Sequence, residues 1–263
     1  MKLNIWQVDA FTNTVFSGNY AAVIILDSWL TDTVMQNIAS ENNVSETAFL
    51  VKTNDATYAI RWFSPLKEID FCGHATLAAA FVLYRNHKAL ERLTFTAPAV
   101  GSLGLVKQAN GFIEMAFPNR QPALVESVPA PLLEGLSIKP VAVLKNTQAY
   151  FAVLASRAEV ENVAVDLAKV KLLAPLDLVV TAADSEVDFV SRYFWPANGG
   201  DEDPVTGSAH AGLAPYWADQ LGKAELKALQ VSKRGGQLQC RVVGDKVNVA
   251  GQAVLYMEGV INI

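Results

Sequence analysis

Cysteine and long apolar runs are both scarce in this chain of 263 residues. Two cysteines, Cys72 and Cys240, cannot build a disulfide framework, and they predict reduced thiols in a cytoplasmic protein. The longest apolar run, residues 75–84, is far shorter than the roughly 20 residues that cross a bilayer. The first residues also lack the apolar stretch of a signal peptide. The sequence therefore predicts no membrane segment and a cytoplasmic location.

Blocks of lysine and arginine are missing as well. The chain has 26 acidic and 21 basic residues, which give a formal net charge of -5. Binding to nucleic acid or to an anionic membrane depends on clustered positive charge, so neither is expected as a partner. With 51% hydrophobic and 18% charged residues, the chain is expected to bury a core and not to be disordered.

The motifs of nucleotide and metal enzymes are absent too. No GxGxxG follows a predicted strand, and there is neither a phosphate-binding P-loop nor a GxSxG nucleophile turn. The three histidines, His74, His87 and His210, are dispersed, without the ligand spacing of a metal site. We therefore expect a protein with no cofactor and no metal.

Proline marks the best domain boundary. Residues 118–131 hold four prolines, and strand-like segments and Ala/Leu-rich helical segments occur on both sides of them. This pattern predicts an α+β protein with one domain over residues 1–117 and a second over residues 118–263. The prediction allows the last strand of the chain to pack against the first strand.

An internal duplication links the two halves. Residues 61–65 read RWFSP, and 131 residues later residues 192–196 read RYFWP. A predicted helix opens at Gly73 after the first copy, and another opens at Gly207 after the second. The repeated order predicts two similar α+β halves that face each other, each with one helix N-terminus at the cleft between them.

Such helix starts have a chemical use. The N-terminus of a helix presents unpaired N–H groups and the positive end of the helix dipole. Glycine at positions 73 and 207 allows a ligand to approach the backbone closely. The pair predicts a receptor for a carboxylate or for an enolate-like intermediate.

Four side chains near these starts could carry proton chemistry. Glu46 stands at the mouth of an apolar strand, where a buried carboxylate would suit general acid/base catalysis, although a surface position is the open alternative. His74 directly follows Gly73, which favours a functional role. One acid of the segment 201–203 should lie beside the second helix start, where Ser208 is a plausible cap.

Several of these segments resemble one known family. The matching segments are Val8–Thr12 with Gly18-Asn19, Ser45–Phe49, Arg61–Pro65, Cys72–Thr76 and Glu202–His210. They are similar to the PhzF-like isomerases of phenazine biosynthesis, within the diaminopimelate epimerase-like superfamily. The family usually has proline after Gly18-Asn19, where this chain has Tyr20. The resemblance implies two similar domains, each a curled, mostly antiparallel sheet around a central helix, with the active site between them, and a homodimer.

The resemblance also implies roles for individual residues. The family's catalytic carboxylate falls on Glu46, and its supporting residues fall on His74, Asp203 and Ser208. The neighbours expected to line the substrate site are Ser45, Cys72, Gly73 and Gly207.

One departure separates this chain from the racemases of the wider superfamily. Those enzymes use two thiols, and here Cys72 occupies the first thiol position while Val205 occupies the second. We therefore predict a cofactor-independent isomerase in which Glu46 moves a proton between carbons of a small carboxylate substrate. Two alternatives remain: an amino-acid racemase or epimerase that uses Cys72, and a ligand-binding protein that has lost the reaction.

Overall fold

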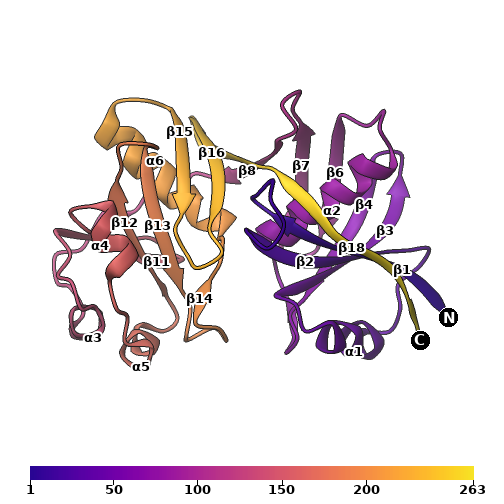
Figure 1. Cartoon of the computed structure of the whole chain (residues 1–263), viewed down its shortest axis with the longest axis horizontal. Coiled ribbons are helices and arrows are strands. Elements are labelled where there is room, and N and C mark those ends of the chain that lie inside the picture. The colour runs from indigo at the N-terminus through magenta and orange to yellow at the C-terminus, as the bar shows by residue number, and fades with distance from the viewer. The chain divides into compact units, whose positions relative to one another are not determined.

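The computed structural model describes residues 1–263 and divides them into two compact units. The first unit comprises Met1–Ala116 and Ala250–Ile263, and the second comprises Phe117–Val249. The C-terminal segment joins the first unit because β18 (Ala253–Asn262) pairs antiparallel with β1 (Lys2–Ala10) along its length. The last strand, for which the sequence allowed packing on the first strand, therefore belongs to the first unit, and Figure 1 shows β18 beside β1.

The first unit combines a mixed sheet with two helices. Besides β1 and β18 its elements are β2 (Asn19–Leu26), α1 (Asp32–Asn42), β3 (Glu46–Asn54), β4 (Thr57–Phe63), β5 (Glu68–Ile69), α2 (Gly73–Asn86), β6 (Arg92–Ala97), β7 (Gly101–Lys107) and β8 (Ile113–Pro118). The strand order is β18-β1-β2-β3-β4-β6-β7-β8, with β5 paired to part of β4. Only the pairs β2–β3 and β4–β6 are parallel, so the sheet is mostly antiparallel.

Helix α2 lies at the centre of the first unit. After Gly73 its sequence is rich in alanine and leucine and contains no further glycine or proline, which favours a helix. Almost all of its residues are buried, and it contacts β1, β2, β3 and β18. A helix that is apolar on all sides needs such a central position, because it has no polar face that could contact water.

The second unit repeats this plan with additional short helices. Its elements are β9 (Ala123–Leu124), α3 (Ala130–Gly135), β10 (Ala142–Lys145), β11 (Ala149–Val153), α4 (Arg157–Asn162), α5 (Leu167–Val170), η1 (Lys171–Leu173), β12 (Asp177–Ala183), β13 (Phe189–Phe194), β14 (Glu202–Asp203), η2 (Gly207–Ala209), α6 (His210–Leu221), β15 (Glu225–Gln230), β16 (Gly236–Val243) and β17 (Lys246–Gly251). The helix predicted from Gly207 starts as the 3-10 turn η2 and becomes α-helical at His210. Neither α2 nor α6 has the length and hydropathy required of a bilayer-crossing helix.

Strand pairing confirms the duplication seen in the sequence. Strands β2 to β7 of the first unit correspond in order to β11 to β16 of the second, with parallel pairs β2–β3 and β11–β12, then β4–β6 and β13–β15. Each unit places its main helix between the fourth and fifth of these strands, α2 between β5 and β6 in one and η2–α6 between β14 and β15 in the other. The predicted α+β fold of two similar halves is therefore confirmed.

The repeated motif has the same internal contacts in both units. Arg61 makes two charged hydrogen bonds of 2.6 Å to Glu68, and Arg192 makes two of 2.7 and 2.9 Å to Glu202. Each guanidinium also lies over the phenylalanine two residues further on, at 5.2 Å in the first unit and 4.9 Å in the second. These paired contacts explain why the RWFSP and RYFWP segments resemble each other, because arginine suits both bidentate carboxylate binding and stacking on a ring.

Candidate active site

Glu46 is the first residue of β3 and is buried. It is in register with Ala21 of the parallel strand β2, and its side chain is 8% exposed. A carboxylate in such a position needs hydrogen-bond donors, because burial removes its contacts with water. The structure thus places Glu46 inside the first unit and not on the surface.

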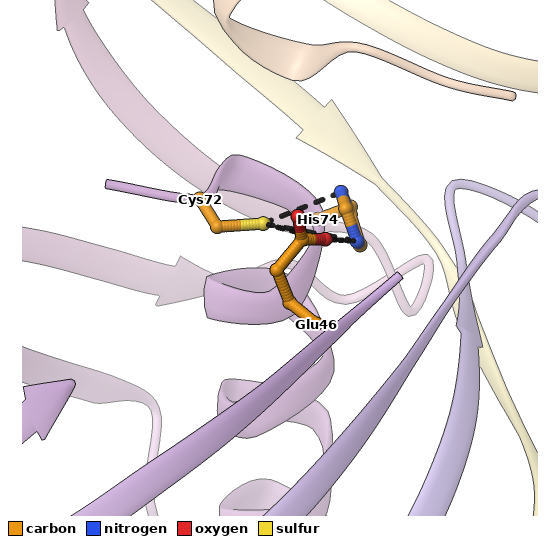
Figure 2. Close-up of side chains that lie close together, drawn as sticks. All are labelled: Glu46, Cys72 and His74. Carbon is orange, nitrogen blue, oxygen red and sulfur yellow. Dashed lines mark hydrogen bonds and ion pairs between the residues drawn. The ribbon is translucent and has the colours of Figure 1, made fainter. Parts of the chain in front are cut away.

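Two side chains from the start of α2 point at this carboxylate, as Figure 2 shows. Nε2 of His74 lies 2.8 Å from Oε2 of Glu46, and the thiol of Cys72 donates to the same oxygen at 3.5 Å. Sγ of Cys72 also lies 3.4 Å from Nδ1 of His74. Cys72 is the N-cap residue of α2 and His74 belongs to its first turn, so the positive end of the helix dipole faces the carboxylate.

The hydrogen bond at Nδ1, the second ring nitrogen of His74, determines which ring nitrogen carries the imidazole proton. The amide nitrogen of Asn19 donates to Nδ1 at 3.1 Å, and the amide oxygen of Asn19 accepts from the hydroxyl of Ser45 at 3.1 Å. Since Nδ1 accepts a hydrogen bond, the neutral imidazole carries its proton on Nε2 and donates it to Glu46. The network therefore runs from Ser45 through Asn19 and His74 to the carboxylate of Glu46.

Gly18 brings Asn19 to this position. Its φ is 67°, in the region that glycine adopts without strain, and a Cβ there would lie 2.2 Å from the carbonyl oxygen of Ala10. No other residue type fits this turn without moving β1. The Gly18-Asn19 pair thus starts β2 with its amide against His74.

Asp203 occupies a comparable place in the second unit. It is half-buried on β14, in register with Tyr193 of β13, and the hydroxyl of Thr206 donates to its carboxylate. The amide of Gln230 bridges the same turn, donating to the Asp203 carbonyl at 2.7 Å and accepting from the Thr206 N–H at 2.8 Å. This turn fixes Asp203 directly before the helical segment that begins at Gly207.

Ser208, close behind Asp203 in the chain, is held by a hydrogen bond from Gln148. The amide of Gln148 donates to the Ser208 hydroxyl at 3.0 Å and to the Tyr193 hydroxyl at 3.0 Å. Tyr193 in turn donates to Asp177 at 2.6 Å, and Asn198 donates to the other oxygen of Asp177 at 2.7 Å. Burial raises the pKa of Asp177, although both donors oppose the shift, and it also raises the pKa of Tyr193.

Asp177 was not among the residues singled out in the sequence. It is the first residue of β12, in register with Ala149 of β11, as Glu46 is the first residue of β3. The offset of 131 residues between the two arginine motifs leads from Glu46 to Asp177. If 131 is added to the number of each polar residue in the first half, Asp177 is identified as the equivalent of Glu46.

The residues expected at the site thus fall into two groups, one in each unit. The first unit brings together Ser45, Glu46, Cys72, Gly73 and His74, and the second brings together Asp203, Gly207 and Ser208. Of the other histidines, His87 is exposed after α2, and His210 is fully buried against Phe189.

No second thiol stands at the start of the second helical segment. Val205, which the sequence comparison placed at the second thiol position, is fully buried. The residue directly before Gly207, where the first unit has Cys72, is Thr206. Cys240 lies on β16, where burial raises the pKa of its thiol.

Glu46, Cys72 and His74 also have the side-chain types that bind transition metals. One oxygen, sulfur and nitrogen donor from these residues lie within 4.8 Å of one another, and all three residues are buried. The sequence alone does not indicate this cluster, because Glu46 and Cys72 are 26 residues apart in the chain.

Comparison with known proteins supports the resemblance noted in the sequence. The sequence profile described as phenazine biosynthesis-like protein matches residues 8–259. A Pseudomonas aeruginosa protein named uncharacterized isomerase PA2770 is 45% identical over 263 residues, with 100% of both chains covered. The crystal structure of a PhzF-family protein from Enterococcus faecalis has a TM-score of 0.95 and 42% identity, again with 100% of both chains covered.

More distant structures share the fold alone. A hydroxyproline epimerase from Agrobacterium vitis has a TM-score of 0.62 at 12% identity and covers 99% of this chain and 92% of its own. Together with the PhzF-family structure, it places the fold in the diaminopimelate epimerase-like superfamily. From the profile and the full-length relatives we conclude that the chain belongs to the phenazine biosynthesis-like PhzF family and is an isomerase.

Proposed function

We propose that this isomerase needs no cofactor and moves a proton between two carbons of a small carboxylate substrate, with Glu46 as the general acid and base. The observation that carries the proposal is the buried Glu46 carboxylate, which accepts a 2.8 Å hydrogen bond from Nε2 of His74 at the start of α2. An ionised carboxylate that is shielded from water is well suited to remove a proton from carbon and to return it.

The reaction proceeds in two proton transfers. Glu46 takes a proton from an activated C–H bond, and the electron pair left on carbon delocalises into the conjugated system of the substrate. The protonated Glu46 then gives the same proton to a different carbon of that system, so the substrate and product have the same composition. The first N–H groups of α2 stabilise the negative charge of the intermediate and of the substrate carboxylate.

Neighbouring groups hold Glu46 in the state required for the first step. The N–H of His74 stabilises the ionised carboxylate and orients the oxygen it contacts. Asn19 keeps His74 in the tautomer that can donate this bond. Asp203 and Ser208 are proposed as supporting residues because the turn at Thr206 and the amide of Gln148 fix their side chains.

The substitution Glu46→Gln tests this role. Glutamine keeps the size of the side chain and can still bond to His74, but it cannot accept a proton from carbon. We expect turnover to fall at least about 100-fold, with the circular dichroism spectrum unchanged. The assay incubates small conjugated carboxylates with the protein in D₂O and follows deuterium incorporation at carbon by NMR.

The matched control is Glu41→Gln, because Glu41 is an exposed glutamate near the end of α1. This variant should retain the wild-type exchange rate. Near-normal exchange by Glu46→Gln on any substrate that the wild type processes would remove Glu46 from the mechanism.

A racemase or epimerase that uses Cys72 is the second candidate, because the Cys72 thiol lies 3.5 Å from Glu46. In that reaction Glu46 would deprotonate Cys72, and the thiolate would exchange the proton at Cα of an amino acid. Exchange of amino-acid Cα–H that is lost in Cys72→Ala would favour this function. Exchange that is retained in Cys72→Ala and lost in Glu46→Gln favours the isomerase.

A further inference from the structure

The donor atoms of Glu46, Cys72 and His74 form a compact triangle. Sγ of Cys72 lies 3.7 Å from Nε2 of His74 and 3.5 Å from Oε2 of Glu46. Nε2 and Oε2 are 2.8 Å apart. Figure 2 shows all three side chains directed toward a common point beside the first turn of α2.

This triangle matches three corners of a tetrahedral zinc site. Zinc binds thiolate sulfur at about 2.3 Å and imidazole nitrogen or carboxylate oxygen at about 2.0 Å. Tetrahedral angles then place sulfur about 3.5 Å from the nitrogen and the oxygen, and place the nitrogen about 3.3 Å from the oxygen. The two sulfur distances already fit within a few tenths of an ångström. The His74–Glu46 distance needs to widen by about 0.5 Å, which side-chain rotation can supply.

The charges and the donor atoms of the three side chains determine which metal ion the site prefers. A thiolate and a carboxylate neutralise a divalent cation, so the complex is neutral overall and suits a buried position. Sulfur and nitrogen donors favour zinc and other soft transition metals, whereas magnesium and calcium require oxygen ligands.

The neighbouring amide can adapt to the bound ion. A histidine that binds metal through Nε2 carries its proton on Nδ1, which then needs an acceptor. Asn19 supplies one by turning its amide over, so that its oxygen accepts from Nδ1 and its nitrogen donates to Ser45. Both hydrogen bonds of the network are thereby preserved.

We propose that Cys72, His74 and Glu46 form a Zn²⁺ site whose occupation switches the enzyme off. The thiol of Cys72 releases its proton to solvent, His74 shifts its proton from Nε2 to Nδ1, and Glu46 binds as the carboxylate. A water of the ion's own hydration shell completes the four ligands, and no atom changes oxidation state. The inhibition, but not the binding, rests on the proposed role of Glu46, whose lone pair the metal occupies.

Cobalt titration tests the site without any substrate. Co²⁺ replaces Zn²⁺ in tetrahedral sites, and a cobalt–thiolate bond produces a near-ultraviolet charge-transfer band. We expect this band to saturate at one equivalent of Co²⁺ per chain in the wild-type protein and to disappear when Zn²⁺ is added. It should be lost in Cys72→Ala and in Cys72→Ser. His74→Gln and Glu46→Gln should each weaken Zn²⁺ binding by at least about tenfold.

The chain offers a matched control for each soft ligand. Cys240→Ala removes the other thiol, on β16, and His87→Gln removes an exposed histidine. Both variants should keep the band and the zinc affinity of the wild type. A wild-type protein without a charge-transfer band, or a band that persists in a folded Cys72→Ala variant, would overturn the metal site.

Inhibition is measured separately, by deuterium exchange at saturating Zn²⁺. Exchange that stops and then returns on adding a chelator supports the switch. Exchange that continues with zinc bound overturns the switch and also removes Glu46 from the reaction, while the binding site stands. Absence of metal binding with normal exchange in the wild type overturns the site and leaves the acid–base role of Glu46 intact.

Discussion

His74 and His210 are both buried, but their surroundings give them opposite character. His74 has polar partners on both ring nitrogens, through Asn19 and Glu46. His210 bonds the carbonyl of Thr206 at 2.9 Å through Nδ1, has no hydrogen-bond partner on Nε2, and lies 5.8 Å from the ring of Phe189. Burial lowers the pKa of His210 from 6.5 to about 4, although the bond to Thr206 opposes the shift.

The lowered pKa of His210 predicts a loss of stability in mild acid. Between pH 6.5 and about 4 the unfolded chain binds a proton at this position and the folded chain does not. The free energy of unfolding therefore decreases as the pH falls, by about 2 kcal/mol at about pH 5 relative to about pH 7. Urea unfolding at these two pH values measures this difference.

Replacement of the ring isolates the contribution of His210. His210→Gln keeps a donor near the Thr206 carbonyl but does not titrate, so its stability should change less between the two pH values. His87→Gln, at an exposed position, should behave like the wild type. An equal pH dependence in His210→Gln and in the wild type would contradict the lowered pKa.

At the scale of elements, each unit starts an equivalent strand with a buried carboxylate. β3 begins with Glu46 and β12 begins with Asp177, yet the partners differ. Glu46 contacts a histidine and a thiol that can exchange protons, whereas Asp177 is held by the hydroxyl of Tyr193 and the amide of Asn198. The first carboxylate is thus suited to chemistry and the second to positioning, because its partners lead through Gln148 to Ser208.

Tyr193→Phe should weaken the second unit. The substitution removes the 2.6 Å hydrogen bond to Asp177 and the acceptor for Gln148. It also raises the pKa of Asp177 further, because the lost bond favoured the ionised form. We expect the free energy of unfolding to fall by about 1–3 kcal/mol, measured by urea denaturation at neutral pH.

The control for this change is Tyr256→Phe, since Tyr256 is 50% exposed on β18. Its stability should stay within about 0.5 kcal/mol of the wild type. If Tyr193→Phe were equally neutral, the Asp177 network would not fix the start of β12.

The sequence predicted elements and motifs better than contacts. Helix α2 was predictable because a run of alanine and leucine without a breaker favours one structure. The sequence does not determine the burial of Glu46, because that burial depends on His74 and on Asn19, which come from distant parts of the chain. Asp177 was missed because only strand register, and not its sequence context, makes it equivalent to Glu46.

At the scale of the whole molecule, the two ends of the chain meet in one sheet. β18 pairs with β1 from Lys2 opposite Asn262 to Ala10 opposite Ala253, and the N–H of Ile263 donates to the Met1 carbonyl at 2.9 Å. β18 therefore covers an edge of β1 that would otherwise expose unpaired backbone groups. The first unit depends on a segment that follows the entire second unit in the sequence.

Deletion of residues 253–263 should unfold the first unit selectively. Without β18, β1 loses a full set of strand hydrogen bonds, whereas the second unit keeps its strands β9 to β17. Hydrogen–deuterium exchange should show loss of protection in β1 and β2 and retained protection in β12 and β13. Deletion of Ile263 alone, outside β18, is the control and should leave both units protected.

Protected β1 amides in the shortened protein would contradict this dependence.

The order of synthesis gives the pairing of β1 with β18 a further consequence. The ribosome makes β1 before the second unit and β18 after it, so the first sheet stays open until β18 has been made. The second unit, encoded between them, has all its strands before the first sheet can close. A nascent or prematurely terminated chain that lacks β18 thus carries an unpaired strand edge, which makes such chains prone to aggregation and a natural target for chaperones.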